Sequence, residues 1–359
     1  MSEFIKGVDI SFLEEQLKQG AVFKDCDKTP APIYTLLKKY GVNGVRFRIW
    51  NEPQHVLQSG GHCSVEKTLA AAKIAKENGM NILLDFHYSD FWADPQQQNK
   101  PKAWENLTFD QLVQAVYDFT KETLLRFTAE NAMPDMVQIG NEIRNGMLWE
   151  DGMIADMIRL GDESHGKVSS VHGKPTNYSN LAKLVNAGML AVKDACKDRV
   201  KIMIHLDEGA NYSLLSEWFD QMNANQMEDF DVIGLSYYPH FHGKIENLEE
   251  TVNKLALRYE KPIYIVETAH PWRFLEEGFV PKEELEKNGY PATPEGQKDM
   301  LDRVFDIAAN IPKGLGRGVY YWEPAIIAAD SGYAANMGIF DEKGVALPSI
   351  ESFRFTVSK

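Results

Sequence analysis

Two glutamates each follow a short apolar run, and this placement is the clearest sign of chemistry in the sequence. Glu142 comes shortly after the run that starts at Met136, and Glu267 directly follows the run Pro262 to Val266. Two carboxyl groups about 5 to 5.5 Å apart can cleave a glycosidic bond with retention, one as nucleophile and one as acid and then base. We expect Glu142 to be the acid/base and Glu267 the nucleophile. The alternative is that both only pair with arginines inside the fold.

Polar and aromatic residues close other apolar runs in the same way. The residues expected to bind substrate are Arg48, Asp85, His87, Trp92, Asn141, His205, Asp207, Tyr238, His240, Trp272 and Trp322. Asn141 directly precedes Glu142, so it is expected to hydrogen-bond a sugar 2-hydroxyl. Arg48 is expected near Glu267, where it would keep that carboxylate charged. Any one of these residues could instead belong to a satisfied network that only fills the interior.

Tryptophan placement favours a sugar ligand. All but one of the tryptophans fall at or just after the ends of apolar runs, namely Trp50, Trp92, Trp104, Trp149, Trp272 and Trp322. Aromatic faces stack on the apolar C–H faces of pyranose rings, so a mouth lined with tryptophan suits an extended glycan. A single tryptophan in a loop often serves only packing.

The elements that must position these residues alternate along the chain. Eight runs are expected to be strands: 5–10, 44–49, 81–86, 136–139, 200–206, 231–236, 262–266 and 318–321. Segments with apolar residues at helical spacing lie between them, at 65–78, 110–130, 180–197, 213–225, 247–260 and 295–309. Strands that alternate with helices indicate a parallel sheet, and eight such units predict a single (β/α)8 TIM barrel of the α/β class. We expect residues 1–359 to form one catalytic domain.

The barrel prediction explains why the polar residues matter. Active sites in this fold form at the carboxyl ends of the strands, so the fourth and seventh strands would present Glu142 and Glu267 obliquely across one mouth. Alternation puts Arg46 with Arg48, and Asp85 with His87, on the inner face of the barrel. Near the N-terminus, Ser11 and Glu14 form a capping-box pattern that predicts a short helix at 12–18.

Composition narrows the partners. The 38 basic and 52 acidic residues give a net charge of −14, which disfavours nucleic acid and anionic membrane surfaces. Cys26, Cys63 and Cys196 show neither a disulfide framework nor zinc-ligand spacing, and no glycine-rich phosphate loop is present. We expect no cofactor, no metal and a monomer. The start of the chain lacks a signal-peptide pattern, so a cytoplasmic location is expected unless such a peptide was removed.

At these residues the sequence resembles glycoside hydrolase family 53, the endo-β-1,4-galactanases of clan A. The resemblance covers nearly the whole chain and is carried by GVDISFLE at 7–14, GVNGVRFRIWNEP at 41–53, LLDFHYSDFWADP at 83–95, QIGNEIRNGMLW at 138–149, GLSYYPHFHG at 234–243, VETAHPW at 266–272, YYWEPA at 320–325 and IFDEKGVALPSI at 339–350. It implies an endo-acting hydrolase of β-1,4-galactan with the two glutamates in the roles given above. It also implies that Arg48, His87, Asn141, Tyr238 and Trp322 surround the cleaved bond.

The chain departs from the family pattern at Phe241 and His270, which leaves product length open. Some bacterial relatives bind calcium after the seventh strand. Here that loop has scattered glutamates without a calcium-loop spacing, so no metal is expected.

Three alternatives remain open at this level. His87, His205 and His240 close three strands and could hold zinc in a metal-dependent hydrolase. The same scaffold could act as a mannanase, xylanase or glucanase, because fold and paired glutamates do not fix the sugar. A binding protein that has lost catalysis is the third.

Overall fold

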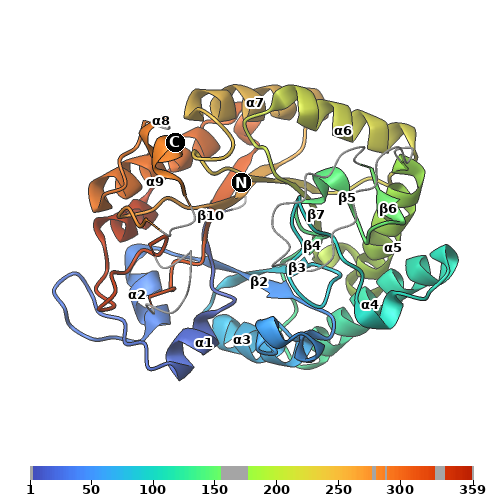
Figure 1. The fold of residues 1–359 in the computed structure, drawn as a ribbon, viewed down its shortest axis with the longest axis horizontal. Coiled ribbons are helices and arrows are strands. Elements are labelled where there is room, and N and C mark those ends of the chain that lie inside the picture. The colour runs from blue at the N-terminus through green and yellow to red at the C-terminus, as the bar shows by residue number, and fades with distance from the viewer. Residues whose placement is uncertain (1–2, 155–176, 277–279, 288, 328–335, 358–359) are drawn as a thin grey trace.

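The computed structural model describes residues 3–154, 177–276, 280–287, 289–327 and 336–357. Eight parallel strands close into a barrel in the order β1-β10-β9-β8-β7-β4-β3-β2 (Figure 1). The strands are β1 (Ile5–Asp9), β2 (Gly44–Ile49), β3 (Asn81–Phe86), β4 (Met136–Ile139), β7 (Lys201–Leu206), β8 (Val232–Ser236), β9 (Ile263–Thr268) and β10 (Gly316–Trp322). The predicted (β/α)8 fold is confirmed. β9 ends two residues later than the sequence indicated, and β10 extends beyond the predicted strand at both ends.

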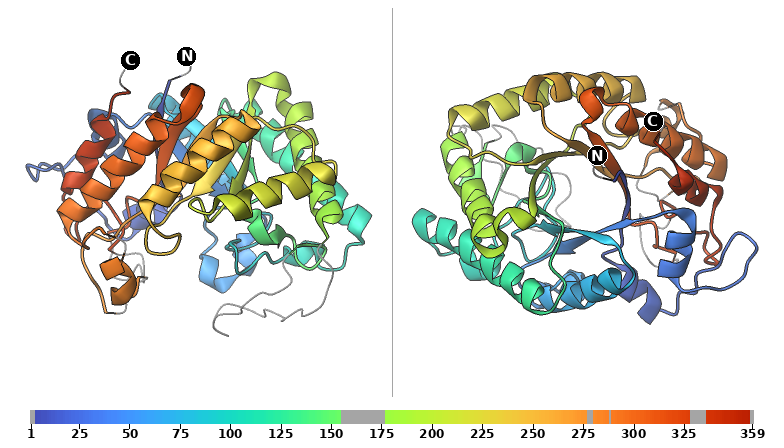
Figure 2. Two further views of the ribbon diagram at one scale, coloured as in Figure 1. Left: turned by 90° about the horizontal axis from the view of Figure 1, so that it is seen from above. Right: turned by 180° about the vertical axis from the view of Figure 1, so that it is seen from behind.

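Helices surround the barrel on its outer side (Figure 2). They are α1 (Leu13–Lys18), α2 (Ile33–Tyr40), α3 (Val65–Glu77), α4 (Phe109–Ala129), α5 (Tyr178–Cys196), α6 (Tyr212–Ala224), α7 (Ile245–Tyr259), α8 (Lys282–Lys287) and α9 (Pro294–Ala309). Local sequence fixes several starts: Thr108 and Gln111 form a capping box on α4, and Ser64 caps α3. No helix in the described ranges is both long and apolar enough to cross a membrane.

The capping box predicted at Ser11 and Glu14 is wrong. Phe12 occupies the position before α1, and no side chain caps that helix. The Ser11 hydroxyl instead donates to Oδ1 of Asp9 at 2.7 Å and accepts from the Arg48 backbone N–H at 2.9 Å. A hydrogen bond to an ionised carboxylate is stronger than one to a neutral backbone group. The buried Asp9 therefore holds Ser11.

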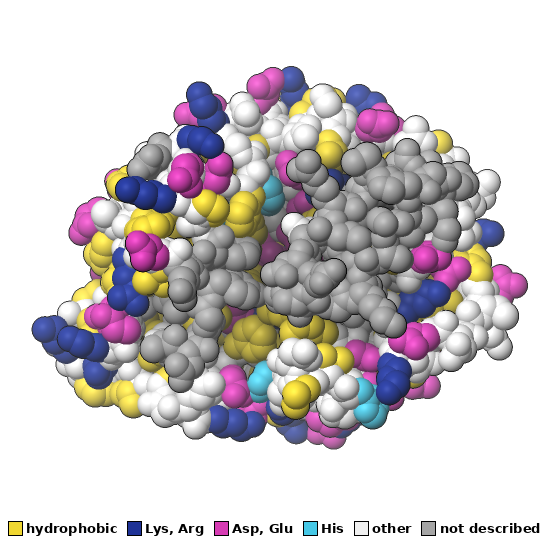
Figure 3. Space-filling view, viewed as in Figure 1, with side chains coloured by type: hydrophobic (Ala, Val, Ile, Leu, Met, Phe, Trp, Pro, Cys, Tyr) yellow, Lys and Arg dark blue, Asp and Glu magenta, His cyan; other side chains and the backbone are white. Residues whose placement is uncertain are grey.

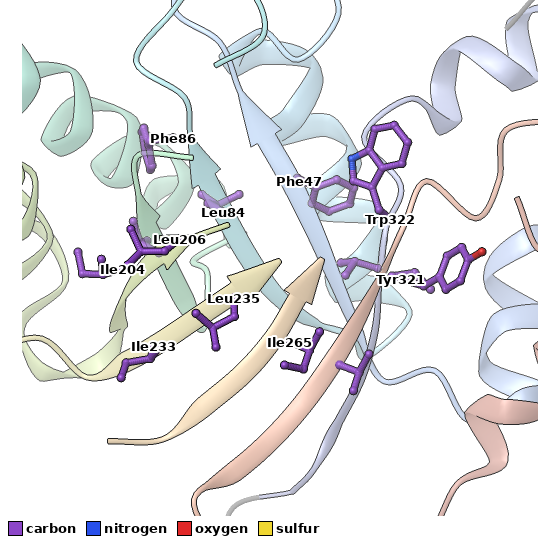
Figure 4. Packing of buried hydrophobic residues seen from close by; sticks show 14 of the residues in the cluster. Phe47, Leu84, Phe86, Ile204, Leu206, Ile233, Leu235, Ile265, Tyr321 and Trp322 are labelled. Carbon is purple, nitrogen blue, oxygen red and sulfur yellow. The ribbon is translucent and has the colours of Figure 1, made fainter. Parts of the chain in front are cut away.

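Apolar side chains on the outer face of the strands join the barrel to its helices. Figure 4 shows Phe86, Leu206, Leu235 and Ile265 in this layer. Each is fully buried. Full burial of such a side chain contributes about 1.5–3 kcal/mol, so this layer holds the strands in fixed register against the helices.

The interior of the barrel changes character along its axis. A buried apolar cluster fills one end and consists of Ile5, Leu83, Met136, Met203, Val232, Tyr264, Val266 and Tyr320. Tyr320 lies so close to Gly7 that a Cβ there would be 2.2 Å from the ring. The inward residues that follow toward the carboxyl ends form what we call the polar layer: Asp9, Arg46, Asp85, Gln138, His205, Ser236 and Glu267. The barrel is thus sealed at one end and carries ionisable groups at the other.

Candidate active site

A β-bulge in β9 aims Glu267 into the barrel. Ile265 pairs with Leu235, but the next pair in the ladder is Glu267 with Ser236, so β9 contains one extra residue. Val266 lies in the interior apolar cluster, and Glu267 also faces inward. Strict alternation after Val266 would have turned Glu267 toward the helices. The bulge is therefore what brings this carboxylate to the mouth.

Both oxygens of Glu267 have donors. Nη1 of Arg46 lies 2.7 Å from Oε1, and the Tyr238 hydroxyl donates to Oε2 at 3.0 Å. Burial raises the pKa of Glu267 above its ordinary value, and the Arg46 guanidinium opposes that rise. Glu267 is thus a buried carboxylate that a fixed cation and a phenol hold in one orientation.

Arg46, and not Arg48, is the arginine beside Glu267. Arg46 is fully buried and also contacts Asp9 at 2.8 Å and Asp85 at 2.7 Å. Arg48 lies one inward position further along β2, where it pairs with Asp9 and Glu323. The expectation that Arg48 keeps Glu267 charged is therefore wrong, because residues two apart on a strand lie in successive layers of the barrel.

Glu142 sits in a turn at the end of β4. Its backbone is left-handed, with φ 48° and ψ 50°, and Gly140 before it has φ 77°. The carboxyl group is buried, and its Oε1 lies 2.5 Å from the Ser236 hydroxyl oxygen. Burial, followed by the charges of Glu267 and Asp207, raises the pKa of Glu142 well above its ordinary value. No cation among the described residues forms an ion pair with Glu142.

Asn141 is held from several directions. Its Oδ1 accepts from Nη2 of Arg46 at 2.9 Å and lies 3.0 Å from Nδ1 of His205. Its Nδ2 donates to the carbonyl of Ala93 at 2.8 Å. These contacts fix which end of the amide is nitrogen and leave one Nδ2 hydrogen for a ligand hydroxyl.

His87 and Asp85 form a pair inside the barrel. Nε2 of His87 lies 3.0 Å from Asp85, whereas its Nδ1 accepts from the Ala93 backbone N–H at 3.0 Å and from the Trp50 ring N–H at 3.3 Å. His205 likewise uses both ring nitrogens, on Asn141 and Ser236. Two of the three histidines in the metal-dependent alternative are therefore committed to protein groups. Sugar contacts by His87, Asp85 or His205 would have to replace existing hydrogen bonds.

Asp207 and His240 differ in their surroundings. Arg144 donates from Nε to both oxygens of Asp207, at 2.9 and 3.0 Å, and burial raises the pKa of Asp207 to about 6. Asp207, Glu208 and His242 form a group of potential metal ligands within the described ranges, but Arg144 already neutralises its acidic side. His240 is buried, and neither ring nitrogen has a hydrogen-bond partner among the described residues. It can therefore still bond a ligand hydroxyl.

The tryptophans divide into two groups. Trp92 and Trp322 lie together, with ring centroids 6.2 Å apart, and the Arg48 guanidinium lies 4.5 Å from the Trp92 ring. Trp272 is half-buried with an unpartnered ring N–H, as judged over the described residues. Figure 3 shows the molecule from the same side as Figure 1. A hollow lies at the centre of this side, with acidic and hydrophobic side chains at its edge.

The other tryptophans at strand ends have contacts with neighbouring protein groups. Trp50 is fully buried against Phe91, and Trp104 packs edge-on against Phe119 of α4. Trp149 donates its ring N–H to the carbonyl of Asn145. The interpretation that all six line the mouth is wrong for Trp50, because its position after β2 turns it into the layer beneath the loops.

Several residues of the site were not among those expected to bind substrate or to act in catalysis, although the sequence placed Arg46 on the inner face of the barrel. Arg46, Gln138 and Ser236 belong to the polar layer, Asp9 links the two arginines, and Glu323 pairs with Arg48. Burial raises the pKa of Glu323 to about 8. Their common signal is a polar residue at an inward position near the carboxyl end of an apolar strand. That signal marks the layer but does not say which residue contacts which.

A closed (β/α)8 barrel with two buried glutamates of unequal surroundings at its mouth is the arrangement of a glycoside hydrolase. The sequence model of Glycosyl hydrolase family 53 matches residues 5–353, and the chain belongs to that family.

Relatives cover the chain almost completely. A protein of Niallia circulans, described as "Uncharacterized protein in bgaB 5'region", is 41% identical over 98% of this chain and 93% of its own length. The "Arabinogalactan endo-beta-1,4-galactanase" of Cellvibrio japonicus is 34% identical over 98% of this chain and 90% of its own. The solved "Ignisphaera aggregans GH53 catalytic domain" superimposes with a TM-score of 0.86 at 34% identity, covering 98% of this chain and 96% of that one.

Proposed function

We propose that this chain is an endo-acting, retaining β-1,4-galactanase that cleaves galactan, as in pectic type I arabinogalactan, into galacto-oligosaccharides. The Cellvibrio japonicus relative, an arabinogalactan endo-β-1,4-galactanase, supports the substrate class. The whole of residues 1–359 would act as one catalytic domain. Glu142 is the acid/base and Glu267 the nucleophile.

The first step follows from the different surroundings of the two glutamates. Glu142 gives its proton to the glycosidic oxygen while Glu267 attacks the anomeric carbon, so the bond to the leaving sugar breaks as a bond to Glu267 forms. The negative charge moves from Glu267 to Glu142, and the net charge of the site is unchanged. The free Nδ2 hydrogen of Asn141 is available to the 2-hydroxyl, a contact that strengthens in the transition state.

The second step reverses these roles. The Glu142 carboxylate takes a proton from a water molecule as the water oxygen attacks the anomeric carbon and Glu267 leaves. Arg46 and Tyr238 already donate to Glu267 and stabilise the departing carboxylate. The product keeps the configuration of the bond that was cleaved.

The observation that carries this function is the contrast between the two carboxyl groups. Glu267 has a cation and a phenol on its oxygens, whereas Glu142 has a hydroxyl and like charges around it. A time course of linear β-1,4-galactan digestion, followed by chromatography, tests substrate and endo action together. Early appearance of a range of oligosaccharides is expected. Absence of any oligosaccharide would refute the galactanase assignment.

Other β-glycanase activities are the alternative, and a substrate panel decides between them. Galactan should be cleaved much faster than mannan, xylan or β-glucan by the same preparation. Glu267→Ala should abolish turnover while galactan binding persists. In a separate experiment, proton NMR of the early products of the wild-type enzyme should show the β configuration. Wild-type turnover in that variant would contradict the nucleophile role, whereas galactan binding without turnover by the wild type would support the non-catalytic binding protein.

A further inference from the structure

A chain of three hydrogen bonds runs from Glu142 into the barrel. Oε1 of Glu142 lies 2.5 Å from Oγ of Ser236, which lies 2.8 Å from Nε2 of His205. Nδ1 of His205 lies 3.0 Å from Oδ1 of Asn141. Ser236 ends β8 and His205 is on β7, so two neighbouring strands supply the middle of the chain. His205 and Ser236 are fully buried.

The far end of this chain fixes the direction of the hydrogens. Oδ1 of Asn141 can only accept, and it also takes a hydrogen from Arg46. His205 must therefore carry its hydrogen on Nδ1. Burial, with Arg46 facing the ring, lowers the pKa of His205 well below its ordinary value, so the ring is neutral and Nε2 has a lone pair.

Ser236 has only one hydroxyl hydrogen for two acceptors. If Glu142 is protonated, Glu142 donates to Ser236 and Ser236 donates to His205, so every group is satisfied. If Glu142 is ionised, the Ser236 hydrogen turns to the carboxylate and leaves Nε2 of His205 buried without a donor. An unsatisfied buried acceptor is destabilising, because it loses its hydrogen bonds to water and gains none in the protein. A hydroxyl that donates to a carboxylate lowers its pKa, but here His205 competes for the same hydrogen.

We propose that His205 is a positioning residue for the acid/base step: it holds the Ser236 hydrogen, so that Glu142 keeps its own proton until the glycosidic oxygen takes it. This rests on the acid/base role proposed above for Glu142. No proton passes along the chain. In the first step the Glu142 proton goes to the leaving oxygen and the Ser236 hydroxyl rotates toward the carboxylate. In the second step Glu142 regains a proton from water and the hydroxyl rotates back.

Other charged groups act on the same two side chains. Glu142 is faced by Glu267 of β9, by Asp207 after β7, which Arg144 pairs, and by Asp94 of the loop after β3. His205 is faced by Arg46 of β2, His87 after β3 and His242 after β8. Substitution at His205 leaves all of these groups in place, so a change in the protonation of Glu142 would report the hydrogen-bond chain.

Two substitutions of His205 test the hydrogen bonds of its two ring nitrogens separately. His205→Asn places an amide near Nδ1, so it retains a donor for Asn141 and removes the acceptor for Ser236. His205→Gln reaches the Nε2 position and can present its carbonyl oxygen to Ser236. The alkaline limb of the pH profile of kcat/KM on linear β-1,4-galactan reports the acid in the free enzyme. The Asn variant should move that limb to lower pH by about one unit, so kcat/KM at pH values above the limb should fall approximately tenfold. The Gln variant should leave the limb in place.

The same substitution in a protein that already carries Ser236→Ala shows whether the shift of the alkaline limb depends on Ser236. In Ser236→Ala, His205→Asn should cause no further shift. Ser349→Ala, which removes another buried serine hydroxyl away from Glu142, is the matched control and should leave the limb in place. An unmoved limb in His205→Asn, an upward shift, or an equal shift in the Ser236→Ala background would each overturn the proposal.

Two further measurements cover the remaining outcomes. If His205→Asn does not fold, Ser236→Ala alone decides: a shift under about half a pH unit fits a hydrogen held by His205, whereas an upward shift above one unit shows that the carboxylate held it. Carbon-13 NMR titration of the Glu142 carboxyl, assigned with Glu142→Gln, needs no substrate. The titration therefore still tests the hydrogen-bond chain if the wild type cleaves no galactan. That result would refute the proposed function without deciding the role of His205.

Discussion

Arg46 and Glu267 form a buried ion pair, with Nη1 of the arginine 2.7 Å from Oε1 of the glutamate. The same guanidinium contacts Asp9, Asp85 and Asn141, so it joins the nucleophile to the residue beside the acid. A single side chain thereby holds groups from four strands or strand ends in position, and it opposes the rise in the pKa of Glu267.

Arg46→Met should both destabilise the fold and shift the acid limb of activity. Removing one partner of a buried charge network typically lowers the free energy of unfolding by about 3–5 kcal/mol. Loss of the cation also raises the pKa of Glu267, so the acid limb of kcat/KM should move up by about one pH unit or more. Urea denaturation and the pH profile measure the two effects. Arg126→Met, which removes an exposed pair with Glu66, should change stability by less than about 1 kcal/mol.

Tyr238→Phe should act on Glu267 alone. The lost hydroxyl donates to Oε2 of Glu267 at 3.0 Å, and a hydrogen bond to an ionised group contributes about 1.5–3 kcal/mol. We expect kcat to fall roughly tenfold or more and the acid limb to move to higher pH. Tyr321→Phe is the control, because that buried hydroxyl donates to the carbonyl of Met337. An identical acid-limb shift in the control would contradict the role of Tyr238.

Glu142→Ala should slow the cleavage of a substrate to an extent that depends on its leaving group. Loss of a general acid lowers rates by about 10²–10⁴-fold, so kcat on galactan should fall within that range. A nitrophenyl β-galacto-oligosaccharide has a leaving group that needs no proton, so its first step should be much less affected. Burst kinetics on that substrate provide the measurement, with the exposed Glu122→Ala as control. Equal losses on both substrates would exclude an acid role.

Glu323→Gln should reduce the pH dependence of stability. Burial raises the pKa of Glu323 to about 8, whereas an unfolded glutamate titrates at about 4.3. Between these values the folded state binds more protons, so the contribution is complete below the lower pKa and is lost as pH rises through the upper one. The variant has no such proton to lose. Its urea midpoint should therefore fall less than that of the wild type between pH 5 and pH 9; parallel curves would contradict the shifted pKa.

The sequence by itself determined the architecture and the composition of the mouth. Strand runs such as Gly44–Ile49 and Asn81–Phe86 are short, rich in apolar residues and separated by helical segments, so local pattern suffices to place them. The residues that follow them must lie at one end of a parallel barrel. Glu142 and Glu267 were found in this way, because each follows such a run directly or within a short turn.

Only the tertiary structure decided which polar groups meet. The extra residue at Val266 turns Glu267 inward, and no local pattern in an apolar run announces a bulge. The choice of Arg46 over Arg48, and the contact of Ser236 with Glu142, depend on how the strands are staggered around the barrel. That stagger is set by the closure of all eight strands together, and a single strand's sequence does not contain it.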